Sequence, residues 1–315
     1  MKKLTCALAL TLLLPSLSLA QDAPDSKPKG EEIAASERKL LLWKVTGKGT
    51  TKTTYLFGTM HVPDKRVLDL PAPVKEAMDG VDALYCELAL EPSLQIQAMK
   101  HMMLPKGKTL AGIIGQDQVD RAAKLLAKRG LPVTSLLTMK PLIFLSNVSQ
   151  VVEYWPELSR GVQPLDAMLY NQAKQAGKEV GGLEKVEDQI AVFDSLSEKS
   201  QKEMVVAGLD AIEKAEKEGT KSTNPLLEAY LAGDLDKMLK LSKEESGDDE
   251  EAVAFMKKLN DDRNVSMTAE IKKHLTTNPD KSYFFAVGSL HYAGPKGIVA
   301  LLKAEGFTVE RVSAN

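Results

Sequence analysis

Two short segments near opposite ends of the chain share a pattern that could place two imidazoles at one site. Each runs from an apolar, aromatic stretch into Gly-x-x-His, and the two repeats close on His61 and His291. The whole chain has only four histidines, so half of them end these repeats. Ligands of α/β proteins bind outside the carboxyl ends of strands, where such side chains are presented. Gly-x-x-His alone is a weak pattern, but its repetition in matching strand context predicts a two-histidine site.

Two carboxylates have a similar placement. Glu87 ends the apolar run over residues 83–88, and Glu184 ends a short strand-like stretch over residues 179–183. A charge that ends an apolar strand is costly to bury unless it is paired or metal-bound, which makes Glu87 the stronger candidate. Glu184 could instead cap the helix expected after it, because acids favour helix N-termini. The sequence leaves these two roles of Glu184 open.

This set of side chains indicates metal chemistry. Two imidazoles with one or two carboxylates suit a divalent transition metal such as Zn, Mn, Fe or Co. Such a metal lowers the pKa of a bound water, and a remaining carboxylate can then act as general base and general acid. Either histidine alone would be read more simply as a loop residue that hydrogen-bonds the backbone. Together with Glu87, the pair favours a site.

Three further residues could carry chemistry. Arg263 and Asn264 could hold a substrate carboxylate or a developing oxyanion. A solvated salt bridge from Arg263 to Asp261 or Asp262 is the simpler interpretation, and the residues alone favour it. Cys86 lies inside an apolar run, which indicates a buried structural thiol rather than a nucleophile.

The elements that must position these residues fall into two similar units. Residues 40–45 and 53–57 are strand-like and flank a glycine-rich turn, which predicts a hairpin. A helix over 71–78 and a strand over 83–88 follow, so we expect the strands that precede His61 and Glu87 to be parallel neighbours. The end of the chain repeats this order, with a strand over 283–287, a helix over 296–304 and a strand over 307–312.

Between the two units the chain is mostly helical. We therefore expect an α/β fold: a central, mostly parallel sheet from two βαβ halves, with a large helical insertion, or cap, over about residues 92–275. Residues 39–315 would form a single domain. Carboxyl ends of parallel strands share one edge of a sheet, so this fold would bring the two histidines and two glutamates together.

The N-terminal residues and the composition indicate the cell compartment and limit the possible partners. Lys2 and Lys3, an apolar run over 4–19 and the small residue Ala20 are typical of a secretory signal peptide. Residues 21–38 predict a flexible leader. We expect cleavage near Ala20, a bacterial periplasmic or secreted protein, and no later membrane span.

The formal net charge of −2 gives no reason to expect nucleic acid as a partner. Cys86 alone remains after cleavage, which excludes a disulfide framework.

Six motifs in a fixed order resemble the TraB/GumN family, within the wider group that includes the Tiki proteases and, more distantly, erythromycin esterases and ChaN-like haem-binding proteins. They lie at residues 55–61, Glu87, 182–189, 230–234, 263–267 and 285–294. The resemblance covers about residues 40–312. One departure is Lys185 after Glu184, where the family usually has Thr.

The resemblance implies a metal-dependent hydrolase of peptidase type that acts on a peptide or another small molecule. A divalent metal (Mn, Co, Zn or Fe) would be held by His61, His291 and Glu87. Glu87, Glu184, Arg263 and Asn264 would be the catalytic residues. Two alternatives stay open: a non-catalytic protein that binds haem or another ligand, and a metal-independent esterase with histidine as general base. The sequence sets no oligomeric state.

Overall fold

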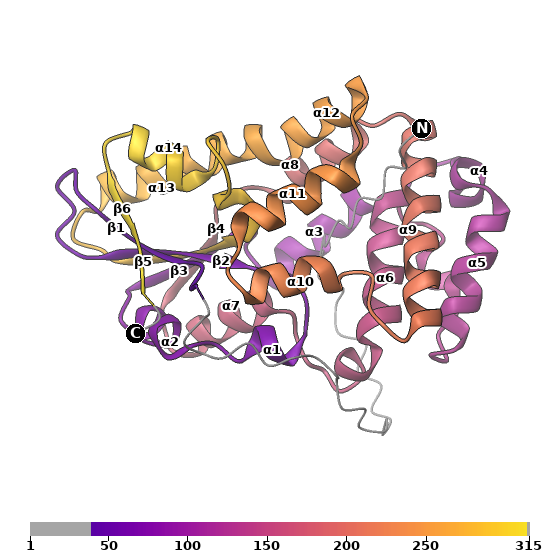
Figure 1. Ribbon diagram of the computed structural model, residues 1–315, viewed down its shortest axis with the longest axis horizontal. Helices are drawn as coiled ribbons and strands as arrows, with labels where there is room; N and C mark the ends of the chain where they lie inside the picture. Colours follow the sequence, from indigo (N-terminus) through magenta and orange to yellow (C-terminus); the bar gives the residue numbers. More distant parts are fainter. Residues whose placement is uncertain (1–38, 314–315) are drawn as a thin grey trace.

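A six-stranded mixed sheet forms the centre of the protein (Figure 1). The computed structural model describes residues 39–313, so the signal peptide and leader expected for residues 1–38 lie outside the described residues. The strands are β1 (Leu42–Thr46), β2 (Thr54–Thr59), β3 (Ala83–Cys86), β4 (Glu179–Gly182), β5 (Tyr283–Gly288) and β6 (Thr308–Arg311). Their order is β4-β3-β5-β2-β1-β6, and β1 alone is antiparallel to its neighbours. The α/β fold with a mostly parallel sheet is confirmed.

The position of β5 corrects one expectation. The hairpin of β1 and β2 is confirmed, but β2 and β3 are not neighbours, because β5 lies between them and is parallel to both. The aromatic side chains Tyr283, Phe284 and Phe285 of β5 are fully buried, and only a central strand is covered on both faces. Thr59 of β2 pairs with Gly288, so the carboxyl ends of β2 and β5 are level.

Helices surround the sheet and extend beyond one end of it (Figure 1). Those whose buried residues pack with the sheet are α1 (Lys65–Leu68), α2 (Ala72–Asp79), α7 (Leu165–Gln175), α10 (Asn224–Leu231), α11 (Leu235–Ser246), α13 (Arg263–Thr277) and α14 (Ile298–Ala304). Those that share a second core are α3 (Pro92–Met102), α4 (Leu110–Ile114), α5 (Gln116–Ala127), α6 (Pro141–Leu158), α8 (Val186–Asp194), α9 (Glu198–Glu218) and α12 (Glu250–Met256). Shorter turns are η2 (Val133–Leu136), η3 (Lys257–Asp262) and η4 (Ser289–Tyr292).

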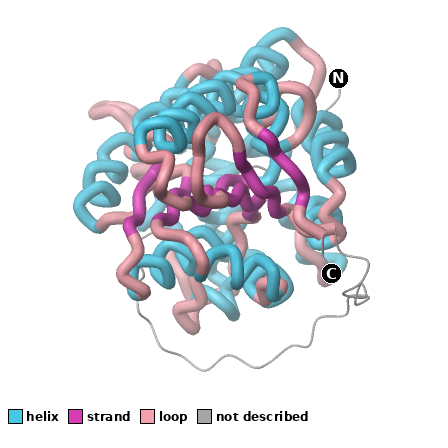
Figure 2. Tube along the Cα trace, turned by 90° about the vertical axis from the view of Figure 1, so that its left-hand side faces the viewer, coloured by secondary structure: helices cyan, strands magenta, loops and turns pink. Residues whose placement is uncertain are grey.

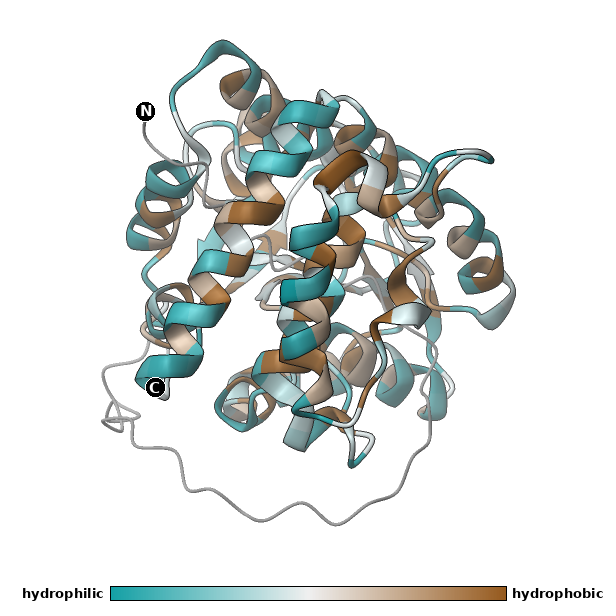
Figure 3. Cartoon of the chain, turned by 90° about the vertical axis from the view of Figure 1, so that its right-hand side faces the viewer, coloured by the Kyte–Doolittle hydropathy of each residue, from teal (hydrophilic) through white to brown (hydrophobic). Residues whose placement is uncertain are grey.

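The sheet is the middle layer of three (Figure 2). Helices α13 and α14 lie on one side of it, and α2 and α7 lie on the other (Figure 1). The second core lies beside this sandwich, among helices that alternate hydrophobic and hydrophilic residues along their length (Figure 3). Two cores therefore meet along the carboxyl edge of the sheet, where β3 leads towards α3 and β4 leads into α8.

The helical range 92–275 contributes to both cores. Helices α7, α10 and α13 and strand β4 pack with the sheet, while α3 to α6 and α9 pack together. The division into one domain with an inserted cap stays a prediction. Within residues 39–313, no helix is long and apolar enough to cross a membrane.

Candidate active site

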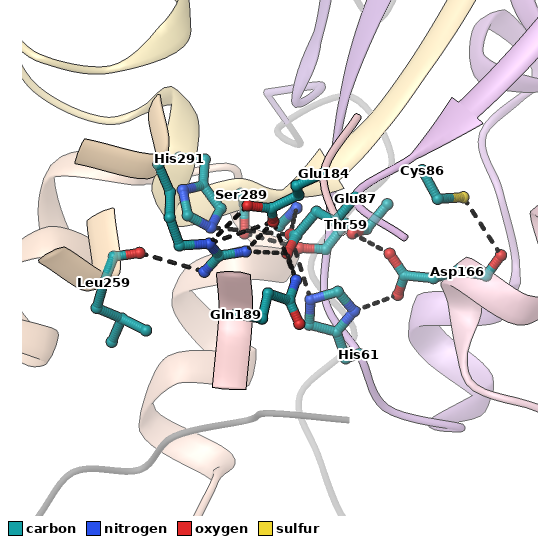
Figure 4. Close-up of polar contacts among 12 residues, drawn as sticks. Thr59, His61, Cys86, Glu87, Asp166, Glu184, Gln189, Leu259, Ser289 and His291 are labelled. Atoms are coloured by element: carbon teal, nitrogen blue, oxygen red, sulfur yellow. Dashed lines mark hydrogen bonds and ion pairs between the residues drawn. The ribbon is translucent and has the colours of Figure 1, made fainter. Parts of the chain in front are cut away.

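One oxygen of Glu87 is the centre of the site (Figure 4). Its Oε1 atom lies 3.6 Å from His61 Nε2 and 3.8 Å from His291 Nε2, and it accepts a 2.7 Å hydrogen bond from the backbone N–H of Gly288. Glu87 directly follows β3, Gly288 ends β5, and His291 lies in the turn η4 after β5. The structure thus brings together the residues predicted from both Gly-x-x-His repeats and the glutamate that follows β3.

Both imidazoles are oriented through their Nδ1 atoms. His61 Nδ1 lies 2.5 Å from Asp166 Oδ2, and His291 Nδ1 lies 2.7 Å from Asn264 Oδ1. The amide nitrogen of Asn264 donates to the carbonyl of Lys296, so its oxygen is the atom that faces His291 and accepts from it. The proton of His291 is therefore on Nδ1, and its Nε2 lone pair points towards Glu87.

Asp166 is the site residue that sequence reasoning missed. It lies in the first turn of α7, and its other oxygen accepts a 2.7 Å hydrogen bond from Thr59 Oγ1. The backbone carbonyl of Thr59 in turn accepts from Ser289 Oγ. A Cβ at Gly58 would lie 3.1 Å from Ser289 Cβ, so glycine lets the two repeats approach closely. The sequence signal that could have identified Asp166 is an acidic residue in the first turn of a helix, within an otherwise apolar stretch.

Arg263 joins the two glutamates. Its Nη2 lies 2.6 Å from Glu87 Oε2, and its Nε donates to Glu184 Oε2 over 3.0 Å. The amide of Gln189 donates to Glu87 Oε2 and to Glu184 Oε1, each over 3.0 Å. With Oε2 of Glu87 held in this way, Oε1 is left to face the histidines.

The simpler interpretation of Arg263 is wrong. Asp262 pairs with Lys257 and Asp261 pairs with Lys296, while the Arg263 side chain is 8% exposed. The π-helical turn η3 precedes Arg263, and Arg263 Nη1 donates to the Leu259 carbonyl within that turn. Single π-turns inside longer helices are frequent at functional sites.

Glu184 does not cap the helix that follows it. Lys185 is the N-cap residue of α8, and it makes no side-chain capping bond. The Glu184 carboxylate instead binds Arg263 and Gln189. Cys86 is buried as expected, and burial raises the pKa of its thiol well above the usual range.

The site pushes the pKa values of its two glutamates apart. Burial opposes charge on Glu87, yet the Arg263 guanidinium and the protonated His61 beside it hold its pKa well below the usual range. Burial raises the pKa of Glu184, although Arg263 opposes the shift. Carboxyls with opposite shifts at one site are a common arrangement for acid–base chemistry.

The two histidines also differ. Burial opposes a charge on His61, but Asp166 outweighs it and raises the pKa of His61 to about 10. Burial and the nearby Arg263 lower the pKa of His291 to about 3. At neutral pH and without a metal, His61 is therefore protonated and His291 is neutral.

The donor atoms fit one metal ion in part. Two ligands about 2.1 Å from one tetrahedral ion lie about 3.4 Å apart, close to the 3.6 and 3.8 Å between the two Nε2 atoms and Glu87 Oε1. A Cβ on Gly288 would lie 2.9 Å from that oxygen and 3.3 Å from His61 Nε2, so glycine leaves the space between them free. Among residues 39–313, however, no three or more His, Cys, Asp or Glu side chains are already grouped as a metal centre. A metal would have to draw these donors slightly closer and displace the His61 proton.

A cleft of about 650 Å³ opens beside these groups. His61, Glu87, Asp166 and Glu184 line one part of it, and side chains of α3 line another. Ligand-binding pockets have volumes of about 300–1,000 Å³. The site is therefore accessible to a molecule larger than water.

Fold and site define an α/β protein with two histidines and a carboxylate at the carboxyl edge of its sheet. The model of the TraB/PrgY/gumN family matches residues 41–311, so the chain belongs to this family.

The chain is also similar to proteins named metalloproteases. It is 25% identical over 342 residues to "Metalloprotease TIKI2" of Danio rerio, covering 92% of this chain and 64% of that protein. It is 26% identical over 355 residues to "Metalloprotease TIKI1" of Homo sapiens, covering 97% of this chain and 68% of the relative. The chain thus spans about two thirds of the length of these curated relatives. No solved structure gives a significant match.

Proposed function

We propose that this protein is a metal-dependent hydrolase that cleaves peptide bonds. The observation that carries the proposal is the convergence of both Nε2 atoms on Glu87 Oε1, beside a space that Gly288 keeps free. Similarity to proteins named metalloproteases supports the reaction class. His61, His291 and Glu87 would hold the divalent metal, whose identity (Mn, Co, Zn or Fe) is left to experiment.

Each residue of the site has a part in this proposal. When bound, a divalent metal polarises a carbonyl and lowers the pKa of a water. Asp166 and Asn264 orient the two imidazoles, as the partners of metal-binding histidines generally do. Glu87 stays charged and holds its position because Arg263 and Gln189 bind its second oxygen.

Glu184 is the group we assign to proton transfer. It lines the cleft, and its raised pKa lets it carry a proton closer to neutral pH than an ordinary glutamate does. Arg263 has its donors engaged with Glu87, Glu184 and the Leu259 carbonyl, so we assign it a positioning role instead of contact with an oxyanion. Asn264 is likewise assigned to positioning, through His291.

The pKa values of the two histidines argue against a histidine general base, and the position of their Nε2 atoms favours an ion over a haem. A histidine must be neutral to act as a general base, and the raised pKa of His61 keeps it protonated in the metal-free protein. The pKa of His291, lowered to about 3, makes that ring a weak base. Both Nε2 atoms lie within 4 Å of Glu87 Oε1, beside a space at Gly288 that suits an ion.

Metal content tests the proposal directly. Protein purified without chelator should contain about one divalent ion per chain, and the pair His61→Ala plus His291→Ala should contain none. The other two histidines of the chain supply a matched control, His101→Ala plus His274→Ala, which should keep the metal. Wild-type cleavage of a peptide library should stop on chelation and return with metal. Equal metal in both pairs, or cleavage that chelators leave unchanged, would refute the proposal.

The cell compartment is a separate proposal, which depends on the N-terminal residues. A signal peptide over residues 1–20 would place the protein in the periplasm or outside a bacterial cell, and we propose that location. Fractionation of cells that produce the full chain, with mass spectrometry of its N-terminus, tests it. A cytoplasmic chain that retains its first residues would contradict it.

A further inference from the structure

Exposed apolar side chains gather on one helix beside the candidate site. The large apolar residues exposed on α3 and at its end are Leu94, Ile96, Met99 and Met103, with exposed fractions of 42%, 65%, 42% and 36%. Over the rest of residues 39–313, only Val253 and Val265 are large, apolar and similarly exposed. Concentration of such side chains on one short helix marks a surface that binds something.

This surface is continuous with the candidate site. Leu94, Ile96 and Met99 line the same cleft as His61 and Glu87. Ala98 and Met102, also on α3, are buried in the helical core, so the helix is anchored without its exposed residues. The exposed face is therefore free to contact a molecule that reaches Glu87.

The composition of α3 indicates which class of molecule its exposed side chains can bind. From residue 92 to residue 99 the helix carries no charged side chain, so this stretch offers nothing to a phosphate or to a charged sugar. Glu91, just before it, is engaged with Lys174. Met side chains are flexible and polarisable, and they adapt to apolar partners of different shape. The other wall of the cleft includes Lys185, whose side chain can donate to a peptide carbonyl.

We infer that the exposed face of α3 is the specificity surface for a peptide substrate, and that it binds apolar side chains next to the bond that is cleaved. This inference rests on the proposed function and adds the substrate class: extended peptides with a run of apolar residues. Ile96 and Met99 are the residues we assign to selectivity.

Peptide binding in the presence of a chelator tests the inference without cleavage. The probes are a fluorescent ten-residue peptide with four consecutive Leu or Val residues and the same peptide with Ser and Gln at those positions. Wild-type protein should bind the apolar peptide at least tenfold more tightly. Ile96→Gln plus Met99→Gln should weaken binding of the apolar peptide by roughly ten- to a hundred-fold, because each side chain loses an apolar contact surface. Binding of the polar peptide should not change.

The control is Val253→Gln plus Val265→Gln, which replaces similarly exposed apolar residues on α12 and α13. It should bind both peptides as the wild type does. Equal affinity of the wild type for the two peptides, or equal losses in the two double variants, would overturn the inference. So would a wild-type dimer that Ile96→Gln plus Met99→Gln dissociates while peptide binding is unchanged, because the surface would then join two copies.

The outcomes separate this inference from the proposed function. Selective binding of the apolar peptide, without metal-dependent cleavage when metal is restored, would support the surface and refute the hydrolase. Metal-dependent cleavage that favours neither peptide, with unselective binding, would refute the surface and leave the hydrolase standing.

Discussion

Replacing Arg263 by Met should destabilise the protein strongly. Its side chain is 8% exposed, and it pairs with Glu87 and Glu184, whose side chains are 9% and 5% exposed. Removing one partner of a buried ion pair typically costs about 3–5 kcal/mol, because the remaining charge stays buried without compensation. Here two carboxylates that share Gln189 would be left, so the loss should reach that range at neutral pH.

The loss should grow with pH. Without Arg263, burial and repulsion from Glu87 raise the pKa of Glu184 further above its unfolded value, while His61 still opposes a rise of the Glu87 pKa. A raised carboxyl pKa means that the folded variant binds more protons than the unfolded chain, so its stability falls as pH rises above about 4.3. The difference from wild type should be smaller at pH 5 than at pH 8. Urea unfolding in chelator at both pH values measures it.

Arg121 supplies the matched control. It also joins two acids, Asp210 and Glu213, but its side chain is 23% exposed and the acids are 44% and 31% exposed. Arg121→Met should therefore cost less than about 1 kcal/mol. Adding Glu184→Gln to Arg263→Met should recover about 0.5–3 kcal/mol, the range over which neighbouring groups couple. Equal losses for the two Arg variants, or no recovery, would refute the reasoning.

Three further predictions concern the site and its support. Gly288→Ala should abolish metal binding measured by calorimetry, because the new Cβ would lie 2.9 Å from Glu87 Oε1; unchanged affinity would argue against an ion in that space. The pKa of His61 is raised to about 10, so protonation of His61 stabilises the folded, metal-free protein. This stabilisation is fully present below about pH 6.5 and is lost as pH rises towards 10. Asp166→Asn should remove this dependence from urea titrations, and a variant that keeps it would contradict the assignment. Asp64 caps α1 and binds Arg66, which lowers its pKa against the effect of burial. Asp64→Asn should cost about 1 kcal/mol at pH 7; the difference should begin to shrink below about pH 3.9 and disappear as pH falls through the lowered pKa of Asp64, and a loss that persists in stronger acid would be inconsistent with the charge.

Several site residues were predictable because they follow strands. His61, Glu87, Glu184 and His291 each end or follow an apolar stretch, and the register of parallel strands brings such ends to one edge. Gly288 was part of the repeat, but the need for glycine there is visible only because a Cβ at that position would lie 2.9 Å from Glu87 Oε1.

Asp166 could not be placed by the same reasoning. It lies on a helix more than a hundred residues from His61, and its contact depends on how α7 packs against β3. Arg263 misled the sequence argument because its neighbours Asp261 and Asp262 are acidic. The π-turn before Arg263, together with the burial of α13 against the sheet, directs its side chain inwards instead.

The sequence by itself determined the strands, their apolar character, the two repeats and the family resemblance, because these depend on local pattern. Only the tertiary structure decided that β5 enters between β2 and β3. Its three aromatic residues require cover on both faces, which a central position provides. That one placement puts Gly288 beside Glu87 and brings the Nε2 atoms of both imidazoles to 3.6 and 3.8 Å from the same oxygen.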